Sequence, residues 1–172
     1  MTTILQTLRV RLREFTDDGL DVVAVLMADQ DQMSLYPRPR TREETHHWVE
    51  RNLSLYEKHG FGFWLMETLD ADDFLGYCGI RPVAIDGIEE IEIGWHTKKE
   101  FWGQGFATET AIACRDLAFT RFDIPRLVAT IDPTNAPSIR VAEKIGMRSE
   151  KEAVLDGWPC LVYSVERPSA SF

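Results

Sequence analysis

A short glycine-containing segment past the middle of the chain constrains the fold most. It reads Trp102-Gly103-Gln104-Gly105-Phe106-Ala107-Thr108-Glu109 and lies between an apolar strand pattern and a long amphipathic helix pattern. Glycines let the backbone turn sharply and let a ligand approach it closely. The helix that follows begins with unpaired N–H groups and the positive end of its dipole. The segment therefore predicts a strand–loop–helix unit that binds an anion, for which phosphate is the usual candidate.

Two common phosphate-binding loops fit this segment poorly. A Walker A loop requires a Gly-Lys-Ser/Thr tripeptide, which the chain does not contain. The dinucleotide-binding fingerprint requires a third glycine where Thr108 stands, although Asp132 ends the next strand pattern and suits a ribose hydroxyl. The loop also lies late in the chain, and only one βαβ-like unit is visible. A nicotinamide- or nucleotide-binding enzyme built on the Gly103/Gly105 turn nevertheless stays open as an alternative.

A third kind of loop is the pyrophosphate loop of acyl-CoA-dependent N-acyltransferases. Four segments occur in one order: Glu92-Ile93-Gly94-Trp95, then Trp102 to Glu109, then Asn135-Ala136-Pro137-Ser138, then Glu143-Lys144-Ile145-Gly146-Met147. This ordered series resembles the GNAT acetyltransferase superfamily, in its RimJ/RimL-like branch (ribosomal-protein N-acetyltransferase-like). The opening Leu8-Arg9-Val10-Arg11-Leu12-Arg13 also resembles the first strand of that branch. The resemblance covers nearly the whole chain and implies a single GNAT acetyltransferase domain over residues 1–172.

Length and charge agree with such a domain. The 172 residues suffice for one domain with a sizeable core. Nineteen basic and 28 acidic residues give a formal net charge of −9, which argues against nucleic acid as a partner. The negative charge is compatible with a cationic amine as substrate, although solubility explains it more simply.

Neither secretion, membrane insertion nor metal binding is indicated. The first residues, Met1 to Leu5, lack the basic region and apolar run of a signal peptide, and no run of about 18 apolar residues follows. Cys78, Cys114 and Cys160 are widely spaced without a CxxC pair, and the four histidines lack metal-ligand spacing. We therefore expect a cytoplasmic protein with no metal and no membrane partner.

Apolar periodicity predicts the element order β, α, α, β, β, β, α, β, α, β, β. The expected strands are 8–15, 61–69, 74–83, 88–96, 126–131, 147–154 and 160–166, and the expected helices follow Thr16, run from Thr41 to Gly60, and cover 105–122 and 135–145. The pattern is that of an α/β protein. The resemblance implies the GNAT (acyl-CoA N-acyltransferase) fold, a mixed, mostly antiparallel sheet with helices on both faces. It also implies a splayed gap between the strand ending near Trp95 and the strand beginning at Arg126.

The resemblance assigns the cofactor-binding residues, with acetyl-CoA (coenzyme A) as the co-substrate. Family members bind the pyrophosphate with successive backbone N–H groups, which implies that role for Gly103, Gln104, Gly105, Phe106, Ala107 and Thr108. Trp102 stands where the family usually has Arg or Gln, so one possible phosphate contact is missing. Asn135 resembles the asparagine that holds the pantetheine arm, and it equally suits the N-cap of its helix.

Acyl transfer to nitrogen needs a free amine, so a carboxylate near the gap can serve as the general base, directly or through water. Glu92 stands where the family often places such a group, and Glu90 points to the same face. Both also suit the role of ordinary paired acids on a strand. In the family, backbone N–H groups of the Ile93-Gly94-Trp95 strand stabilise the thioester oxygen. We expect Gly94 to mark a bulge that aims them.

Two further positions bear on the leaving thiolate. Many GNAT enzymes protonate it with a tyrosine, but Ala142 stands at that position. RimJ/RimL-like members place a serine at the start of the same helix, and Ser138 matches it, so we expect Ser138 to hydrogen-bond to the sulfur. A helix-capping role is the alternative. Because this tyrosine is missing, a second alternative remains, in which the protein is a catalytically weak sensor that binds CoA.

The sequence thus predicts an N-acetyltransferase that transfers acetyl from acetyl-CoA directly to a primary amine. No Ser/His/Asp or Cys/His arrangement indicates a covalent intermediate. The acceptor is a small-molecule amine or a protein N-terminus, with Trp158 and the segment Tyr36 to Arg40 as expected walls of its site, and homodimer formation is left open.

Overall fold

A computed structural model describes residues 2–169 of the chain. Its strands are β1 (Thr3–Gln6), β2 (Val10–Arg13), β3 (Phe63–Thr68), β4 (Phe74–Ile85), β5 (Ile88–Thr97), β6 (Arg126–Ile131), β7 (Arg148–Leu155) and β8 (Trp158–Glu166). Its helices are α1 (Asp17–Ala28), α2 (Arg42–His59), the short 3-10 helix η1 (Lys99–Phe101), α3 (Phe106–Thr120) and α4 (Ala136–Lys144).

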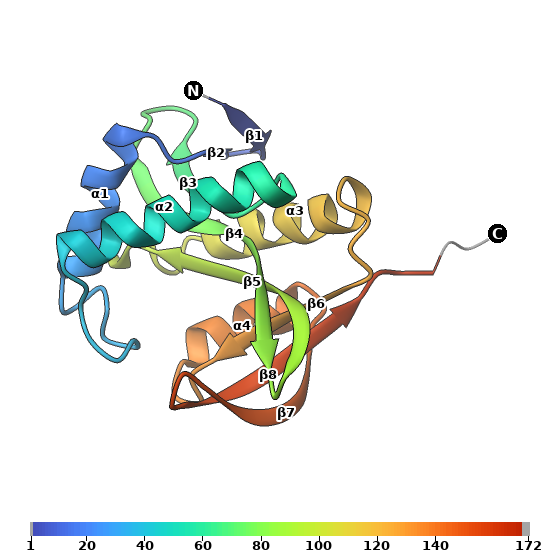
Figure 1. Cartoon of the computed structure of the whole chain (residues 1–172). Helices are drawn as coiled ribbons and strands as arrows, with labels where there is room; N and C mark the ends of the chain where they lie inside the picture. Colours follow the sequence, from blue (N-terminus) through green and yellow to red (C-terminus); the bar gives the residue numbers. More distant parts are fainter. Residues whose placement is uncertain (1, 170–172) are drawn as a thin grey trace.

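The strands form one sheet in the order β1-β2-β3-β4-β5-β6-β8-β7 (Figure 1). Neighbouring strands are antiparallel except β5 and β6, which are parallel. The predicted mixed, mostly antiparallel α/β fold is confirmed. The predicted element order is confirmed except for two additional elements, β1 at the N-terminus and η1.

The expected strand over residues 8–15 is present as β2, but β1 before it was not predicted, and residues 7–9 form a turn between the two. The backbone N–H of Thr7 donates to the carbonyl of Val10 at 2.8 Å, and the N–H of Val10 donates to the Thr7 hydroxyl at 3.0 Å. These bonds close a tight turn between β1 and β2, and Leu8 lies at its tip with 88% of its surface exposed. A turn held by one threonine side chain leaves no mark on apolar periodicity, so the pattern did not show it.

The capping residues around α2 confirm its predicted limits. The Thr41 hydroxyl accepts from the N–H of Glu44, and the Glu44 carboxylate accepts from the N–H of Thr41, so the capping box is complete. Gly60 ends the helix in the left-handed conformation, at φ 76°. Between these caps, Trp48 packs its ring against Phe63 of β3. Helix α2 thereby fixes one wall of the region described below.

Helices cover both faces of the sheet (Figure 1). Along β3, Trp64 and Met66 pack in the core cluster that includes α3, whereas Leu65 packs with α1 and α2. This alternation follows from the two-residue period of a strand. Helix α3 buries Phe106 and Phe119 near its two ends. The residues that it buries between them are small, namely Thr110, Ala111, Cys114 and Ala118, and they allow it to lie close to the sheet.

The predicted splay between β5 and β6 is confirmed. The two strands share a single bridge, between Glu92 and Val128. Beyond it β5 continues to Thr97 and β6 to Ile131 without pairing. Backbone polar groups of β5 that face this opening have no ladder partner there, so they are available to a ligand.

Two other features bear on the sequence expectations. None of the helices within residues 2–169 is both long and apolar enough to cross a membrane. Over the same residues, no three His, Cys, Asp or Glu side chains gather closely enough to hold a metal ion. All three cysteines are buried and free, and Cys78 lies with its sulfur 3.5 Å from that of Cys114.

Candidate active site

Two adjoining cavities open where β5 leaves β6. The first, which we call the loop cleft, has a volume of about 360 Å³ and lies over the N-terminus of α3. The second, the gap cavity, has a volume of about 200 Å³ and lies between the splayed strands. The first volume falls within the range of about 300–1,000 Å³ that is usual for ligand pockets. Residues that line both are Leu35, Tyr36, Trp95, Asn135 and Ser138. The cavities therefore meet along these residues.

The backbone of the loop curls at the start of α3. Gly103 and Gly105 have φ values of +74° and +83°, which residues with a side chain rarely adopt. The first backbone hydrogen bond of α3 runs from Glu109 N–H to the carbonyl of Gly105, at 3.0 Å. The N–H groups of Phe106 to Thr108 precede it and have no partner within the helix. They lie at the positive end of the helix dipole, beside the loop cleft.

Most of the predicted cofactor-binding residues are brought together here. The residues of the glycine loop that line the loop cleft are Trp102, Gly103, Gly105, Phe106, Ala107 and Thr108. The Gln104 side chain turns back instead and donates to the carbonyl of Glu100 at 3.2 Å. Ile93 and Gly94 line the gap cavity, and Trp95 lines both cavities.

Arg9, which the sequence did not single out as a site residue, braces this loop. Its guanidinium donates to the carbonyl of Gln104 at 3.0 Å and to the carboxylate of Glu109 at 2.7 Å. It also lies over the Phe106 ring, 4.3 Å from the centroid. Burial alone would raise the pKa of Glu109, but hydrogen bonds from Thr7 and Arg9 outweigh it and hold that pKa below its usual value. The β1–β2 hairpin thus fixes the loop conformation.

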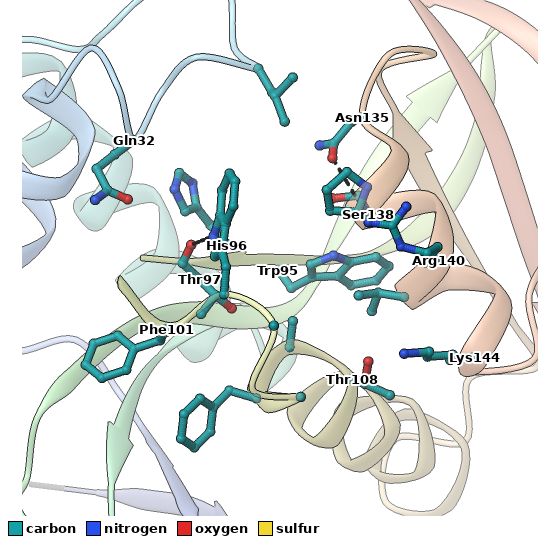
Figure 2. Close-up of a pocket in the computed structure, with 18 of the residues that line it drawn as sticks. Gln32, Trp95, His96, Thr97, Phe101, Thr108, Asn135, Ser138, Arg140 and Lys144 are labelled. Carbon is teal, nitrogen blue, oxygen red and sulfur yellow. Dashed lines mark hydrogen bonds between the residues drawn. The ribbon is translucent and has the colours of Figure 1, made fainter. Parts of the chain in front are cut away.

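Helix α4 contributes positive charge to the opposite side of the loop cleft. Figure 2 shows Arg140 and Lys144 of α4 across the cleft from Thr108 of α3, with the Trp95 indole between the two helices. Both cations line the cleft. Together with the α3 amides they make this cleft suited to a phosphorylated ligand.

The start of α4 places Asn135 and Ser138 at the junction of the cavities (Figure 2). The Asn135 side chain caps the helix by accepting from the N–H of Ser138 at 3.1 Å. Because the cap uses the backbone of Ser138, the serine hydroxyl remains available to a ligand. Ala142, one turn further along, is fully buried.

The structure separates the two carboxylates that the sequence could not rank. Glu92 is only 6% exposed and lines the gap cavity. One of its oxygens accepts from Arg81 Nε at 2.7 Å, and the other accepts from the Thr130 hydroxyl. Glu90 pairs instead with Arg126 at 3.2 Å and is absent from the lining of both cavities.

Sequence reasoning missed Arg81, although the sequence carries a signal for it. The two-residue Asp86-Gly87 turn joins β4 to β5 and pairs Ile85 with Ile88. Counting back along both strands from that turn places Arg81 opposite Glu92, as the structure shows.

The expectation of a bulge at Gly94 was wrong. The pairing of β4 with β5 runs from Gly76 and Thr97 to Ile85 and Ile88 without a change of register. A Cβ atom at position 94 would lie 2.9 Å from the Phe63 ring. Gly94 is therefore required by the close approach of an aromatic wall of the gap cavity.

Tyr36 is positioned by stacking on a buried histidine. Its ring lies parallel to that of His96, with centroids 5.3 Å apart, and the Tyr77 hydroxyl lies 3.4 Å from His96 Nδ1. Burial lowers the pKa of His96 to about 4, so the imidazole is neutral at neutral pH. Burial likewise raises the pKa of the Tyr36 hydroxyl. These three side chains form a polar but uncharged wall.

Trp158, an expected wall of the acceptor site, lies away from this region. The turn between β7 and β8 consists of Asp156 and Gly157 alone, because Leu155 pairs with Trp158. Trp158 therefore begins β8, where it is 50% exposed and absent from the lining of both cavities.

Comparison with known proteins gives consistent matches. A family model described as an acetyltransferase (GNAT) domain matches residues 9–148. The Bacillus subtilis (strain 168) protein YkkB is 38% identical over 162 residues, which cover 94% of each chain. The N-acetyltransferase YnaD of the same organism is 31% identical over 147 residues, or 85% of this chain and 83% of that one.

Solved structures share the fold. An acetyltransferase from Agrobacterium tumefaciens C58 superposes with a TM-score of 0.84 at 27% identity, over 97% of this chain and 95% of that one. A RimL ribosomal L7/L12 alpha-N-protein acetyltransferase in complex with coenzyme A has a TM-score of 0.74 at 20% identity. The match covers 96% of this chain and 98% of that one. A spermidine N-acetyltransferase from Vibrio cholerae in complex with CoA and spermine has a TM-score of 0.73 at 16% identity. The match covers 91% of this chain and 95% of that one.

The last two likenesses concern the fold alone, whereas the family model spans most of the chain. The alternative of a nicotinamide-binding enzyme on the Gly103/Gly105 turn therefore falls away. The chain belongs to the GNAT family and is an acyl-CoA-dependent acetyltransferase.

Proposed function

We propose that this protein transfers an acetyl group from acetyl-CoA directly to a primary amine, at the junction of the loop cleft and the gap cavity. One observation carries the proposal. The cleft over the N-terminus of α3 is continuous, through Trp95, Asn135 and Ser138, with the cavity that contains Glu92. A thioester that lies along the first cavity reaches the second, where an amine and a base can meet it.

The residues of the loop cleft fit coenzyme A. Backbone N–H groups from Gly103 to Thr108 bind the pyrophosphate, and the α3 dipole and the cations Arg140 and Lys144 add favourable charge. The pantetheine arm passes Asn135 toward the gap cavity. The left-handed conformation of two glycines at a helix N-terminus supports this assignment, because it turns successive amides toward one point.

The chemistry is direct attack without a protein nucleophile. The amine nitrogen forms a bond to the thioester carbon, the C–S bond breaks, and the nitrogen loses a proton to Glu92, directly or through one water. Backbone N–H groups of Ile93 to Trp95 stabilise the oxyanion. The Ser138 hydroxyl donates a hydrogen bond to the departing sulfur, which then takes a proton from solvent.

Glu92 is buried and also lines the gap cavity, which supports its role as the general base. Its two hydrogen bonds use one lone pair on each oxygen, so each oxygen can still accept a proton or a water. Arg81 keeps the carboxylate oriented toward the opening between the strands.

A thiol-release assay with a panel of amines tests the proposal. We expect free CoA to appear only when both acetyl-CoA and an accepted amine are present, with the N-acetyl product identified by mass. If purified protein binds CoA in calorimetry but releases no thiol above the hydrolysis background with any amine, it is a CoA-binding sensor and the proposal is wrong.

A further inference from the structure

The charged groups of the gap cavity are balanced in sign. The charged residues that line it are Arg40, Arg81, Glu92 and Asp132. Five aromatic side chains also line it, those of Tyr36, Trp48, Phe63, Tyr77 and Trp95. Two cations and two anions beside aromatic walls suit an acceptor that itself carries both signs of charge and an apolar group.

Arg40 is the cation in this cavity without a partner of its own. It lies at the end of the segment that joins α1 to α2, and its N–H donates to the carbonyl of Met27 at 2.7 Å, which fixes its backbone. The ion pairs formed within residues 2–169 include Arg38 with Glu44 and Arg81 with Glu92, but none that involves Arg40.

Arg40 lines the gap cavity together with Tyr36 and Tyr77. Its charge lowers the pKa of both Tyr36 and Tyr77, although burial of the two phenols prevails and raises them. Arg40 is itself half-buried and lies near the buried Tyr77, so its guanidinium is partly desolvated. Such a cation favours a ligand that supplies an anion.

Arg81 can contribute to the same anion site. Its hydrogen bond to Glu92 uses Nε, and a guanidinium has four further N–H donors on its terminal nitrogens. Its side chain is partly exposed and lies toward the Phe63 ring. Asp156 adds a negative charge nearby. Neutralised by Arg81, Glu92 does not repel an anionic group held by Arg40.

Asp132 marks the other end of the cavity. It follows β6, and its Oδ1 accepts from the N–H of Thr134 at 2.7 Å. The Asp132 carboxylate therefore supplies negative potential for an incoming ammonium group. An amine with no anionic group would leave Arg40 unpaired.

We propose that Arg40, with the terminal nitrogens of Arg81, binds the carboxylate of a small amino-acid-like acceptor. Its amine is directed toward Glu92, and its apolar or aromatic side chain lies against Trp48 and Phe63. This inference rests on the proposed function and narrows its acceptor class to small amino carboxylates. A protein N-terminus, whose first carboxyl group is an amide, lacks the group that Arg40 would bind.

Matched acceptors test the inference. We would compare phenylalanine with phenylalanine amide and phenethylamine, and leucine with leucine amide and isopentylamine. For the wild type we expect kcat/KM to be about 10- to 100-fold higher for the free amino acids, the range for a hydrogen bond to a charged group. Arg40→Ala should abolish this preference by lowering kcat/KM for the amino acids alone.

Arg38→Ala is the matched control, because Arg38 lies two residues away and pairs with Glu44 outside the gap cavity. It should leave the preference unchanged. Arg40→Lys, which keeps the charge but loses the fork geometry, should retain part of it. Melting temperatures of all three variants show whether each one folds.

The inference is overturned if amides, dipeptides or simple amines are acetylated as well as the amino acids, or if Arg40→Ala lowers every rate equally. Either result leaves the proposed acetyl transfer intact. If no amine is acetylated, the carboxylate subsite is tested by binding alone, in a calorimetric titration of CoA-saturated protein with phenylalanine. Binding by the wild type that Arg40→Ala weakens supports the carboxylate subsite, and equal or undetectable binding refutes it.

Discussion

Glu92 of β5 and Arg81 of β4 face each other across the sheet, with 2.7 Å between the arginine Nε and a carboxylate oxygen. The pair lies at the last point where β5 contacts β6, since the single bridge between those strands is at Glu92 itself. The pair is fixed on one side by the β4–β5 pairing, and on the other side it faces the gap cavity. This arrangement makes Glu92 the carboxylate best placed to take a proton from the acceptor.

Glu92→Gln should lower kcat by about 100-fold or more, the usual contribution of a general base. The loss should be largest at low pH, where more of the acceptor amine is protonated. Stopped-time assays across a pH series measure it. Glu90→Gln is the control, because Glu90 pairs with Arg126 outside the cavities, and its rate should stay near wild type. An unchanged pH–rate profile for Glu92→Gln would remove Glu92 from the mechanism.

Ser138→Ala should slow turnover several-fold while leaving the affinity for CoA near that of the wild type. The helix cap survives, because Asn135 bonds to the backbone N–H of residue 138 and not to its hydroxyl. Asn135→Ala provides the contrast, since it removes the cap together with the contact that we propose to the pantetheine arm. Turnover rates and CoA calorimetry separate the two effects. A wild-type rate for Ser138→Ala would leave the serine as a structural residue only.

Arg9→Ala should weaken CoA binding several-fold without a direct contact to the ligand. It removes the bond to the Gln104 carbonyl and the charge that orients Glu109 at the first turn of α3. Arg121→Ala is a suitable comparison, because Arg121 also lies over an aromatic ring, that of Phe122, but away from the loop cleft. Calorimetric titration with CoA gives the answer. Equal affinities for both variants would show that the loop holds its conformation without Arg9.

His96 should make the protein less stable in mild acid. Burial depresses its pKa from 6.5 to about 4, so between these values the unfolded chain binds a proton that the folded protein does not. Stability is therefore full above pH 6.5 and falls by about 1.4 kcal/mol per pH unit as the pH drops toward 4. Urea unfolding at pH 7 and pH 5 measures this loss.

His96→Gln should reduce the loss between pH 7 and pH 5 by about 2 kcal/mol relative to the wild type. The comparison concerns the pH dependence, since the lost stacking on Tyr36 changes absolute stability as well. His46→Gln, at an exposed position on α2, serves as the control. If His96→Gln and the wild type lose the same free energy between the two pH values, the imidazole is not held neutral by the fold.

Local signals in the sequence were sufficient for much of the fold. The capping box at Thr41 and the glycine at position 60 delimit α2, and the strand over residues 126–131 matches its apolar run. The boundary between β1 and β2 depends on one side-chain hydrogen bond, at Thr7, and apolar periodicity does not predict such a boundary. The splay at Glu92 was expected from the family resemblance and not from the strand patterns themselves.

The part of the site that is formed by one continuous backbone segment could be predicted from the sequence. The part that is formed by side chains far apart in the sequence was harder to predict. The glycine loop is contiguous, so its residues were found together. Arg9 reaches it from the β1–β2 turn, 95 residues before Gln104 in the chain. The stacking of Tyr36 on His96, and the approach of Arg40 to the gap cavity, depend on how the segment after α1 folds back over the sheet. No local pattern encodes that path.

The central claim is that the amides at the start of α3 hold the diphosphate of CoA, and Gly105→Val tests it most directly. A β-branched residue at φ +83° is strained and cannot keep the loop conformation. Gly157→Val, at the same φ but in the β7–β8 turn, is the matched control. In calorimetric titration with CoA we predict no measurable binding by Gly105→Val and near wild-type binding by Gly157→Val. Wild-type affinity in a folded Gly105→Val protein would contradict the account.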